Sequence, residues 1–308
     1  MKLLKIIPKT LAKIQGKNKS KSLKVFLIVA LVLSISFLVF LFKNNESSEL
    51  TQTKFESNTK VYYDEKTFMK GIEYANNQKA FSQKVFGGII PHHQLPGFII
   101  AEFYKGLKNQ KPKTIILLGP NHYEKGNFYA LVSNNSWSTP FGDVIPDKNV
   151  IDLLVRNNYV QIENETVSSD HSVGTSMPFI KYYLADTQVV PIILSGKMTH
   201  AETENLASIL STLNLPIVTS VDFSHYLTSA EAQEKDSETL KILEVFNIRQ
   251  LFSLNSDYLD SPPCIATLLY AMQMMGKTNY KILQNTNSGI LTNNHTSPTT
   301  SYFSIIYY

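Results

Sequence analysis

The longest apolar run in the chain covers residues 25–42 and reads VFLIVALVLSISFLVFLF. Ser34 and Ser36 are its only polar positions. A helix of this length spans about 27 Å at roughly 1.5 Å per residue, which is close to the hydrocarbon thickness of a bilayer. The run therefore predicts one transmembrane helix. A buried core helix is the less favoured alternative, because such a helix normally keeps a polar face.

The flanks of this run help to decide between a cleaved signal peptide and an uncleaved anchor. A signal peptide usually has an apolar region of about 7 to 15 residues that ends in a small-x-small cleavage site. The run here is longer and continues into KNNESSE without such a site, which favours a signal-anchor helix. Residues 1–24 contain eight lysines and no acidic residue. The positive-inside rule then predicts a single-pass membrane protein with a cytoplasmic N-terminus and an extracytoplasmic C-terminal domain.

Residues 43–59 are polar, show no apolar periodicity and are predicted to be a linker. Beyond them, short β-branched runs alternate with longer amphipathic segments. The expected strands are residues 85–90, 114–118, 189–194, 217–221, 280–283 and 302–307. The expected helices are residues 65–83, 96–108, 148–157, 177–184, 201–213, 229–252 and 264–275. This alternation predicts an α/β fold for residues 60–308, as a single three-layer domain with a mostly parallel central sheet flanked by helices.

The composition fits a globular chain whose charge is unevenly distributed. Hydrophobic residues make up 43% of the chain, which is enough for one large core. The net charge is +4, but without the eight lysines of residues 1–24 only 21 basic residues stand against 25 acidic ones. Binding to nucleic acid needs a surplus of Lys and Arg that neutralises phosphates. The sequence therefore predicts no nucleic-acid partner for the globular part.

Histidines follow three of the expected strands. In mostly parallel sheets, ligands bind beyond the carboxyl ends of the strands. His92 and His93 follow the first expected strand, His122 follows the second and His225 follows the fourth. A single histidine is more often a structural residue, but three converging segments favour a functional site. Asp222, in the same segment as His225, adds a carboxylate that can orient an imidazole.

Two further residues are candidates that also have structural interpretations. Cys264 is the only cysteine, follows a Ser-Pro-Pro sequence and opens an apolar helical run. A helix N-terminus favours the thiolate form of a cysteine, but a cysteine is often simply a small buried hydrophobe. His171 stands in an Asp-His-Ser sequence before an expected helix. There, Asp170 or Ser172 can instead serve as a helix cap.

Six motifs along the globular part resemble one known family. The motifs are FGGIIPHHQLPG, IILLGPNHY, WSTPFGDV, DHSVGTSMPFI, VVPIILSG and TSVDFSHYL. They occur in the order and approximate spacing of the Memo-like proteins, also called AmmeMemoRadiSam system protein B, and the resemblance covers about residues 84–306. It implies a fold like that of the class III extradiol ring-cleaving dioxygenases, with a pocket of histidines and a cysteine that can hold a metal.

The resemblance also implies roles for particular residues. The three implied metal ligands are His92, His122 and Cys264. The three implied catalytic residues are His225 as acid or base, Asp222 beside it, and His171. Iron is the expected metal, with copper or zinc as alternatives.

The sequence departs from the family pattern at three places. His93 and Gln94 stand where members commonly have a small residue and Gly. Gly174 stands where members commonly have Glu, and Ile265 follows the cysteine in place of Gly. The first departure alters access to the pocket or offers a competing ligand.

These features predict a metal-dependent, iron-type redox or dioxygenase-like enzyme of unknown substrate, with a small molecule or a peptide in the metal pocket. One alternative is a non-catalytic protein that binds a metal or a peptide in the same pocket. Another is a structural membrane protein with a vestigial pocket. The family name implies a radical-SAM protein as a partner.

Overall fold

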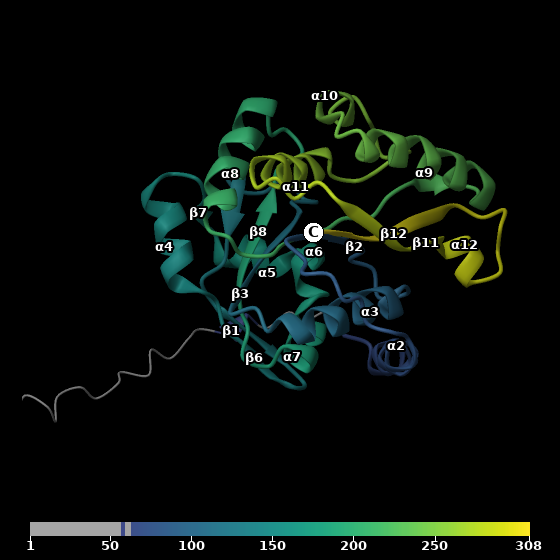
Figure 1. Ribbon diagram of the computed structural model, residues 1–308, viewed down its shortest axis with the longest axis horizontal. Helices are drawn as coiled ribbons and strands as arrows, with labels where there is room; N and C mark the ends of the chain where they lie inside the picture. Colours follow the sequence, from purple (N-terminus) through teal and green to yellow (C-terminus); the bar gives the residue numbers. More distant parts are fainter. Residues whose placement is uncertain (1–56, 59–62) are drawn as a thin grey trace, which may run out of the picture. The chain divides into compact units, whose positions relative to one another are not determined.

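A mixed β-sheet of nine strands lies at the centre of the described part of the chain (Figure 1). The computed structural model describes residues 57–58 and 63–308, which fall within one compact unit, Phe55–Tyr308. Eight strands follow the order β10-β12-β2-β9-β3-β8-β4-β7, and β11 pairs with β12. The strands are β2 (Gly87–Ile90), β3 (Thr114–Pro120), β4 (Ala130–Val132), β7 (Gln161–Ile162), β8 (Gln188–Leu194), β9 (Ile217–Ser220), β10 (His225–Leu227), β11 (Tyr280–Asn287) and β12 (Thr299–Tyr307).

The four strands β2, β9, β3 and β8 in the middle of the sheet are parallel. Antiparallel pairing begins on either side of them, where β12 pairs with β2 and β4 pairs with β8. β11 and β12 also pair antiparallel. They are joined by residues 288–298, a connection shorter than the crossover of about a dozen residues or more that a parallel pair needs. The α/β class is thus confirmed. The sheet is mixed, however, because the predicted parallel arrangement holds only for its four central strands and for the pair of β4 and β7.

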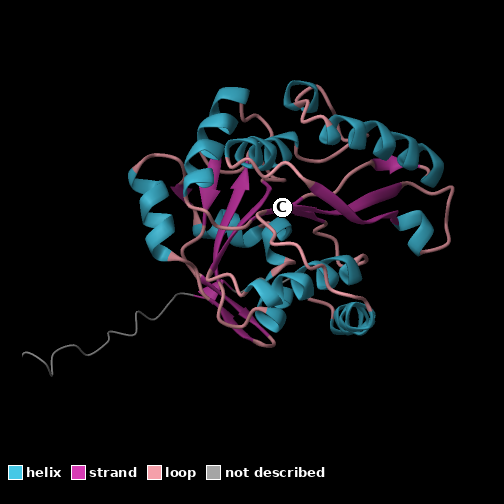
Figure 2. Cartoon of the chain, in the orientation of Figure 1, coloured by secondary structure: helices cyan, strands magenta, loops and turns pink. Residues whose placement is uncertain are grey.

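Helices cover both faces of the sheet (Figure 2), because side chains along each strand alternate between two cores. In β3, Ile116 and Leu118 belong to the first core, and Ile115 and Leu117 belong to the second. The first core is covered by α4 (Lys148–Arg156), α8 (His200–Thr212), α9 (Ser229–Glu244), α10 (Ile248–Leu251) and α11 (Pro262–Met274). The second core is covered by α2 (Glu65–Asn77), α3 (Gly97–Leu107) and α7 (Met177–Tyr183).

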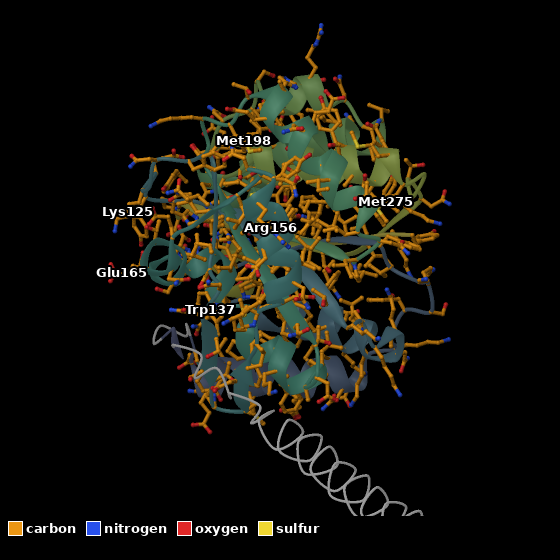
Figure 3. All side chains as sticks on the ribbon, turned by 90° about the vertical axis from the view of Figure 1, so that its left-hand side faces the viewer. Lys125, Trp137, Arg156, Glu165, Met198 and Met275 are labelled. Carbon is orange, nitrogen blue, oxygen red and sulfur yellow. The ribbon has the colours of Figure 1, made fainter. Side chains whose placement is uncertain are left out.

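Shorter elements complete the described chain. They are the helices η1 (Lys108–Gln110), α5 (Asn164–Ser169), α6 (His171–Gly174) and α12 (Ser288–Leu291), and a separate sheet of β1 (Ser57–Asn58), β5 (Ser136–Thr139) and β6 (Gly142–Val144). Trp137 of β5 is fully buried among the side chains of the second core (Figure 3). Residues 57–58 were predicted as the end of a linker, but they form β1, which pairs with β5.

The predicted helix over residues 229–252 is two helices in the structure. The first, α9, ends at Glu244, and Phe246 then takes a left-handed backbone conformation with a φ of 52°. The side chain of Asn247 accepts a hydrogen bond from the backbone N–H of Gln250 and so caps α10. No Gly or Pro marks this break, which explains why the apolar periodicity did not reveal it.

Within residues 57–58 and 63–308, no helix has both the length and the apolar character that a membrane span requires. This finding contradicts the predicted membrane localisation, which is therefore not retained. The predicted basic segment at residues 1–24 and the predicted transmembrane helix at residues 25–42 lie outside the described residues, as does most of the predicted linker at residues 43–59.

Candidate metal centre

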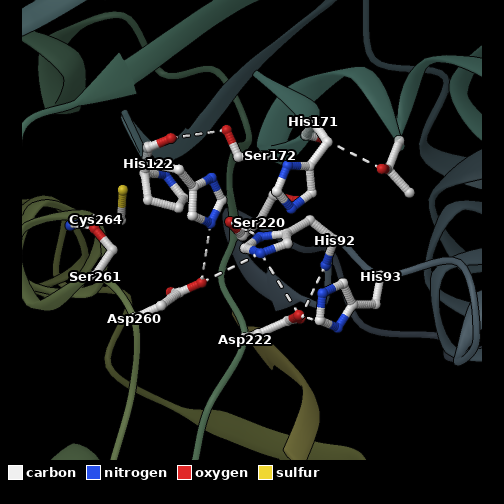
Figure 4. Close-up of polar contacts among 12 residues, drawn as sticks. His92, His93, His122, His171, Ser172, Ser220, Asp222, Asp260, Ser261 and Cys264 are labelled. Atoms are coloured by element: carbon white, nitrogen blue, oxygen red, sulfur yellow. Dashed lines mark hydrogen bonds and ion pairs between the residues drawn. The ribbon is translucent and has the colours of Figure 1, made fainter. Parts of the chain in front are cut away.

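Three neighbouring strands end at one edge of the sheet and deliver candidate side chains. β2, β9 and β3 are adjacent and parallel, so their carboxyl ends lie side by side. His92 follows β2, Asp222 follows β9 and His122 follows β3. Figure 4 shows these side chains gathered in one cluster, and the space that they face is called the pocket below.

A fourth segment brings Asp260 into the same pocket. Asp260 lies in the loop before α11 and was not selected from the sequence. An isolated β-bridge between Leu259 and Phe223 holds this loop against the segment that follows β9. In addition, the backbone N–H of Asp260 donates to the backbone carbonyl of Asp222 at 3.1 Å. These contacts fix Asp260 beside residues that are distant in the sequence.

His92, His122 and Asp260 form a group whose donor atoms can hold a metal ion. The Oδ2 atom of Asp260 lies 3.2 Å from His92 Nε2 and 3.7 Å from His122 Nε2. Neither carboxylate oxygen of Asp260 has a hydrogen-bond partner among the described residues. Buried polar atoms without a partner are rare and call for an explanation such as an ion. The three side chains face a common point, where the carboxylate of Asp260 lies within ion-pair distance of both imidazoles without a hydrogen bond to either.

Hydrogen bonds behind the two imidazoles direct their Nε2 atoms toward Asp260. The Nδ1 atom of His92 lies 3.0 Å from the backbone carbonyl of Ser220. A carbonyl only accepts, so in the neutral ring that binds a metal Nδ1 carries the proton and the lone pair lies on Nε2. The Nδ1 atom of His122 lies 2.8 Å from Asp170 Oδ1, in the same arrangement. Such outer hydrogen bonds orient histidines that bind metals.

The carboxylates make this buried pocket favourable for positive charge. Burial alone lowers the pKa of His92, but the charges of Asp222 and Asp260 outweigh burial and raise this pKa to about 10. Burial also lowers the pKa of His122, but the carboxylates of Asp170 and Asp260 beside it outweigh burial and raise the value to about 9. Burial opposes ionisation of Asp260, yet the charge of His92 holds the pKa of this carboxyl well below its usual range. A metal cation and protons therefore compete for one site.

His171 and His93 extend the cluster on the side of the pocket away from Asp260. The ring of His171 stacks on that of His122 with centroids 4.4 Å apart, and lies 5.0 Å from the ring of His92. Burial and the neighbouring charges of His92 and His122 lower the pKa of His171 to about 4. His171 is therefore a neutral imidazole near pH 7. Its donor atoms form two further candidate groups, one with His92 and His93 and one with His122 and Asp170.

The close approach of β3 to α6 supports this cluster and gives a testable prediction. A Cβ atom on Gly119 would lie 2.6 Å from Ser172 Oγ and 2.8 Å from Ser172 Cβ. We expect Gly119→Ala to lower the free energy of unfolding by about 1–3 kcal/mol, because β3 and α6 must separate. Urea denaturation measures this change. Gly97→Ala is the matched control, since its Cβ would meet atoms only at 3.5 Å or beyond, and equal losses in both variants would contradict the prediction.

A family model described as Memo-like protein matches residues 62–306 of this sequence. The chain belongs to the Memo-like family. This match confirms the family that the six motifs predicted, and it covers almost all of the described residues.

Relatives of this Memo-like chain are named MEMO1 family proteins. One from Pyrobaculum arsenaticum is 31% identical over 242 residues, which are 73% of this chain and 84% of the relative. One from Pyrobaculum aerophilum is 28% identical over 239 residues, again 73% of this chain and 84% of the relative. A third, from Nitrosopumilus maritimus, is 26% identical over 223 residues, 69% of this chain and 81% of the relative.

Cys264 occupies a different environment from the two candidate ligand histidines, His92 and His122. It is fully buried in the first core, and its backbone N–H donates to Ser261 Oγ at 3.4 Å. Burial raises the pKa of the thiol, which disfavours the thiolate that binds metals. In the described chain, Cys264 belongs to no group of side chains that can hold a metal. The structure thus brings His92 and His122 together with Asp260, four residues earlier, rather than with Cys264.

The remaining predicted residues lie in or beside the Memo-like pocket. Asp222 is fully buried; its Oδ1 accepts the backbone N–H of His92 at 3.0 Å, and its Oδ2 lies 2.8 Å from His93 Nδ1. His225 begins β10 and is in no candidate metal group of the described residues. Its Nδ1 atom is buried and has no hydrogen-bond partner among these residues. Burial lowers the pKa of His225, although Asp260 and Asp222 partly oppose this shift.

Proposed function

We propose that this Memo-like chain is a metal-dependent enzyme that carries out redox, dioxygenase-like chemistry on a small molecule. It holds a divalent cation, foremost iron, through His92, His122 and Asp260. The observation that carries this proposal is the convergence of two imidazole Nε2 atoms on one carboxylate that has no hydrogen-bond partner among the described residues. Two histidines and one carboxylate with open coordination positions are typical of non-haem Fe(II) oxygenases. The fold relation of the family to extradiol dioxygenases adds support by analogy.

The residues around the metal group have distinct proposed tasks. When bound, the metal supplies a Lewis-acidic, redox-active centre with open positions for substrate. Ser220 and Asp170 hold the two histidine rings in position. His225 is kept neutral because burial lowers its pKa, so its imidazole accepts a proton from a substrate hydroxyl. His92 and Asp222, which are almost completely buried, exclude water from one side of the pocket.

A non-catalytic function of the same pocket is the second candidate. Tyr123 and Tyr226 directly follow His122 and His225, and their side chains are exposed. Exposed tyrosines beside a pocket suit contact with a peptide or a protein partner. In that case the metal would organise a binding surface. A radical-SAM protein remains the partner that the family resemblance implies.

Oxygen uptake by the full-length chain distinguishes the two candidates. The protein is loaded anaerobically with Fe(II) and mixed with a panel of catechols and other phenols. We expect oxygen consumption and product formation with at least one phenol, and loss of both in the Asp260→Asn variant. Tight Fe(II) binding without turnover on the whole panel would favour the non-catalytic candidate. Absence of Fe(II), Cu(II) and Zn(II) binding would exclude both.

The environment of Cys264 leads to a separate prediction. We expect Cys264→Ala to retain iron within about twofold of the unsubstituted chain, because a buried thiol with a raised pKa is a poor ligand. Metal content per chain after anaerobic loading and gel filtration measures this directly. A drop in iron as large as that in Asp260→Asn would instead make Cys264 a ligand, as the family resemblance implies.

A further inference from the structure

Three imidazoles form a second group of donors within the same pocket. One nitrogen each of His92, His93 and His171 lies within 4.8 Å of the other two. The ring of His92 is nearly perpendicular to both of the others, at 84° to His93 and 86° to His171. The rings of His93 and His171 are almost parallel, with centroids 6.2 Å apart. In Figure 4, Asp260 lies to the left of the His92 ring and His93 lies to its right.

This second group shares one member with the first, and that member serves one ion at a time. His92 belongs both to the group with His122 and Asp260 and to the group with His93 and His171. Its Nδ1 atom faces the carbonyl of Ser220 and carries a proton. Once a metal displaces the proton of Nε2, the Nε2 lone pair is the one that remains for bonding, and it forms one bond to a metal. An ion in one position therefore excludes an ion that uses His92 in the other.

The two positions differ in donor chemistry. The first offers two imidazoles and a carboxylate, and the second offers three imidazoles. Carboxylate oxygens suit manganese and, with histidine, Fe(II), whereas imidazoles suit copper, nickel and zinc. Copper(II) also binds most strongly in the general order of divalent affinities. The second position has a buried negative charge beside it, because Asp222 Oδ2 lies 2.8 Å from His93 Nδ1 and 3.5 Å from His92 Nε2.

The second position also has access to solvent. The side chain of His93 is 40% exposed, against 1% for His92. A metal site needs an entry path, and His93 provides one. His93 stands where the family resemblance leads to a small residue, so the donor that completes this position is a feature of this particular chain.

We propose that the pocket offers a single divalent cation two mutually exclusive positions that share His92. One position is completed by His122 and Asp260, and the other by His93 and His171. Copper(II) takes the all-histidine position, and manganese(II) and iron(II) take the position with the carboxylate. This inference rests on the proposed metal site, since both positions use His92. It adds a choice of ligands that depends on the metal.

Substitution of His93 tests the proposal. Full-length chain freed of metal is titrated with Mn(II) and, separately, with Cu(II), and the copper form is examined by EPR for the number of coupled nitrogens. We expect His93→Ala to weaken Cu(II) binding by about 10-fold or more and to remove one nitrogen from the spectrum, with Mn(II) affinity changed less than threefold. Asp260→Asn should weaken Mn(II) binding by about 10-fold or more and change the Cu(II) affinity less than threefold, with the number of coupled nitrogens unchanged. His295→Ala is the control, because this histidine is exposed and only its backbone carbonyl bonds Ser229.

The outcomes separate this inference from the proposed function. If Asp260→Asn abolishes Mn(II) binding while His93→Ala leaves the copper spectrum unchanged, the second position is refuted and the first stands. An equal loss of affinity for Cu(II) and for Mn(II) in His93→Ala would also overturn the inference. So would the binding of two copper ions per chain at these histidines. If the unsubstituted chain binds no Mn(II), Fe(II) or Cu(II), the proposed function and this inference both fail.

Discussion

Asp260→Asn is expected to lower the affinity of the chain for Fe(II) and Mn(II) by more than the roughly 10- to 100-fold that loss of an outer-sphere partner costs. An amide oxygen is a neutral and weaker donor than a carboxylate. The substitution also removes the buried negative charge that lies 3.2 Å from His92 Nε2. Anaerobic titration of the metal-free chain with Mn(II), followed by calorimetry or by the EPR signal of free Mn(II), measures the change.

The matched control for this experiment is Asp257→Asn. Asp257 lies in the same loop, and its side chain accepts from Asn255 at 3.3 Å rather than facing the histidines. Mn(II) at about 100 times its dissociation constant should stabilise the unsubstituted chain by about 2.7 kcal/mol. The control should keep this stabilisation and Asp260→Asn should lose it. Retained stabilisation in Asp260→Asn would remove Asp260 from the proposed site.

Asp170→Asn is expected to weaken both metal binding and the fold. Asp170 is fully buried, with Oδ1 accepting from His122 Nδ1 at 2.8 Å and from the Ser172 N–H at 2.9 Å. Its Oδ2 accepts the backbone N–H of His122 at 2.8 Å. An amide places an NH2 group against at least one of these donors. We expect a loss of roughly 10- to 100-fold in Mn(II) affinity and of about 1–3 kcal/mol in the free energy of unfolding without metal.

Urea denaturation of the metal-free protein and Mn(II) titration together measure these two effects. Asp152→Asn is the control, since Asp152 is an exposed carboxylate on α4. It should change neither quantity. A destabilised Asp170→Asn variant with unchanged metal affinity would show that Asp170 caps α6 without orienting His122.

The part of the site that follows regular strands was predictable from the sequence. β-branched runs located β2, β3 and β9, and the rule that ligands bind at the carboxyl ends of parallel strands then led to His92, His122 and Asp222. These residues converge because their strands are neighbours in the sheet. The antiparallel strands at the flanks of the sheet were harder to predict from the sequence. β4 and β10 have only three residues each, which are too few positions for a periodic pattern.

Asp260 was missed because no strand precedes it. Its place depends on the bridge between Leu259 and Phe223 and on its own N–H bonding to Asp222, which are long-range contacts that spacing along the chain does not reveal. A carboxylate directly before the Ser-Pro-Pro helix start was the available signal, once two histidines had been chosen. Cys264 attracted attention as the single cysteine, but as the third residue of α11 its side chain lies within the first core.

The same bridge has a consequence for the entropy of ion capture. A ligand on a free loop loses its conformational freedom when the ion arrives, and this cost is subtracted from the affinity. Here backbone hydrogen bonds join the segments of Asp222 and Asp260 when the protein folds, although β10, α9 and α10 lie between them in the sequence. The conformational entropy of bringing the two segments together is therefore lost during folding and not during metal binding. An incoming cation meets donors that are already held in place.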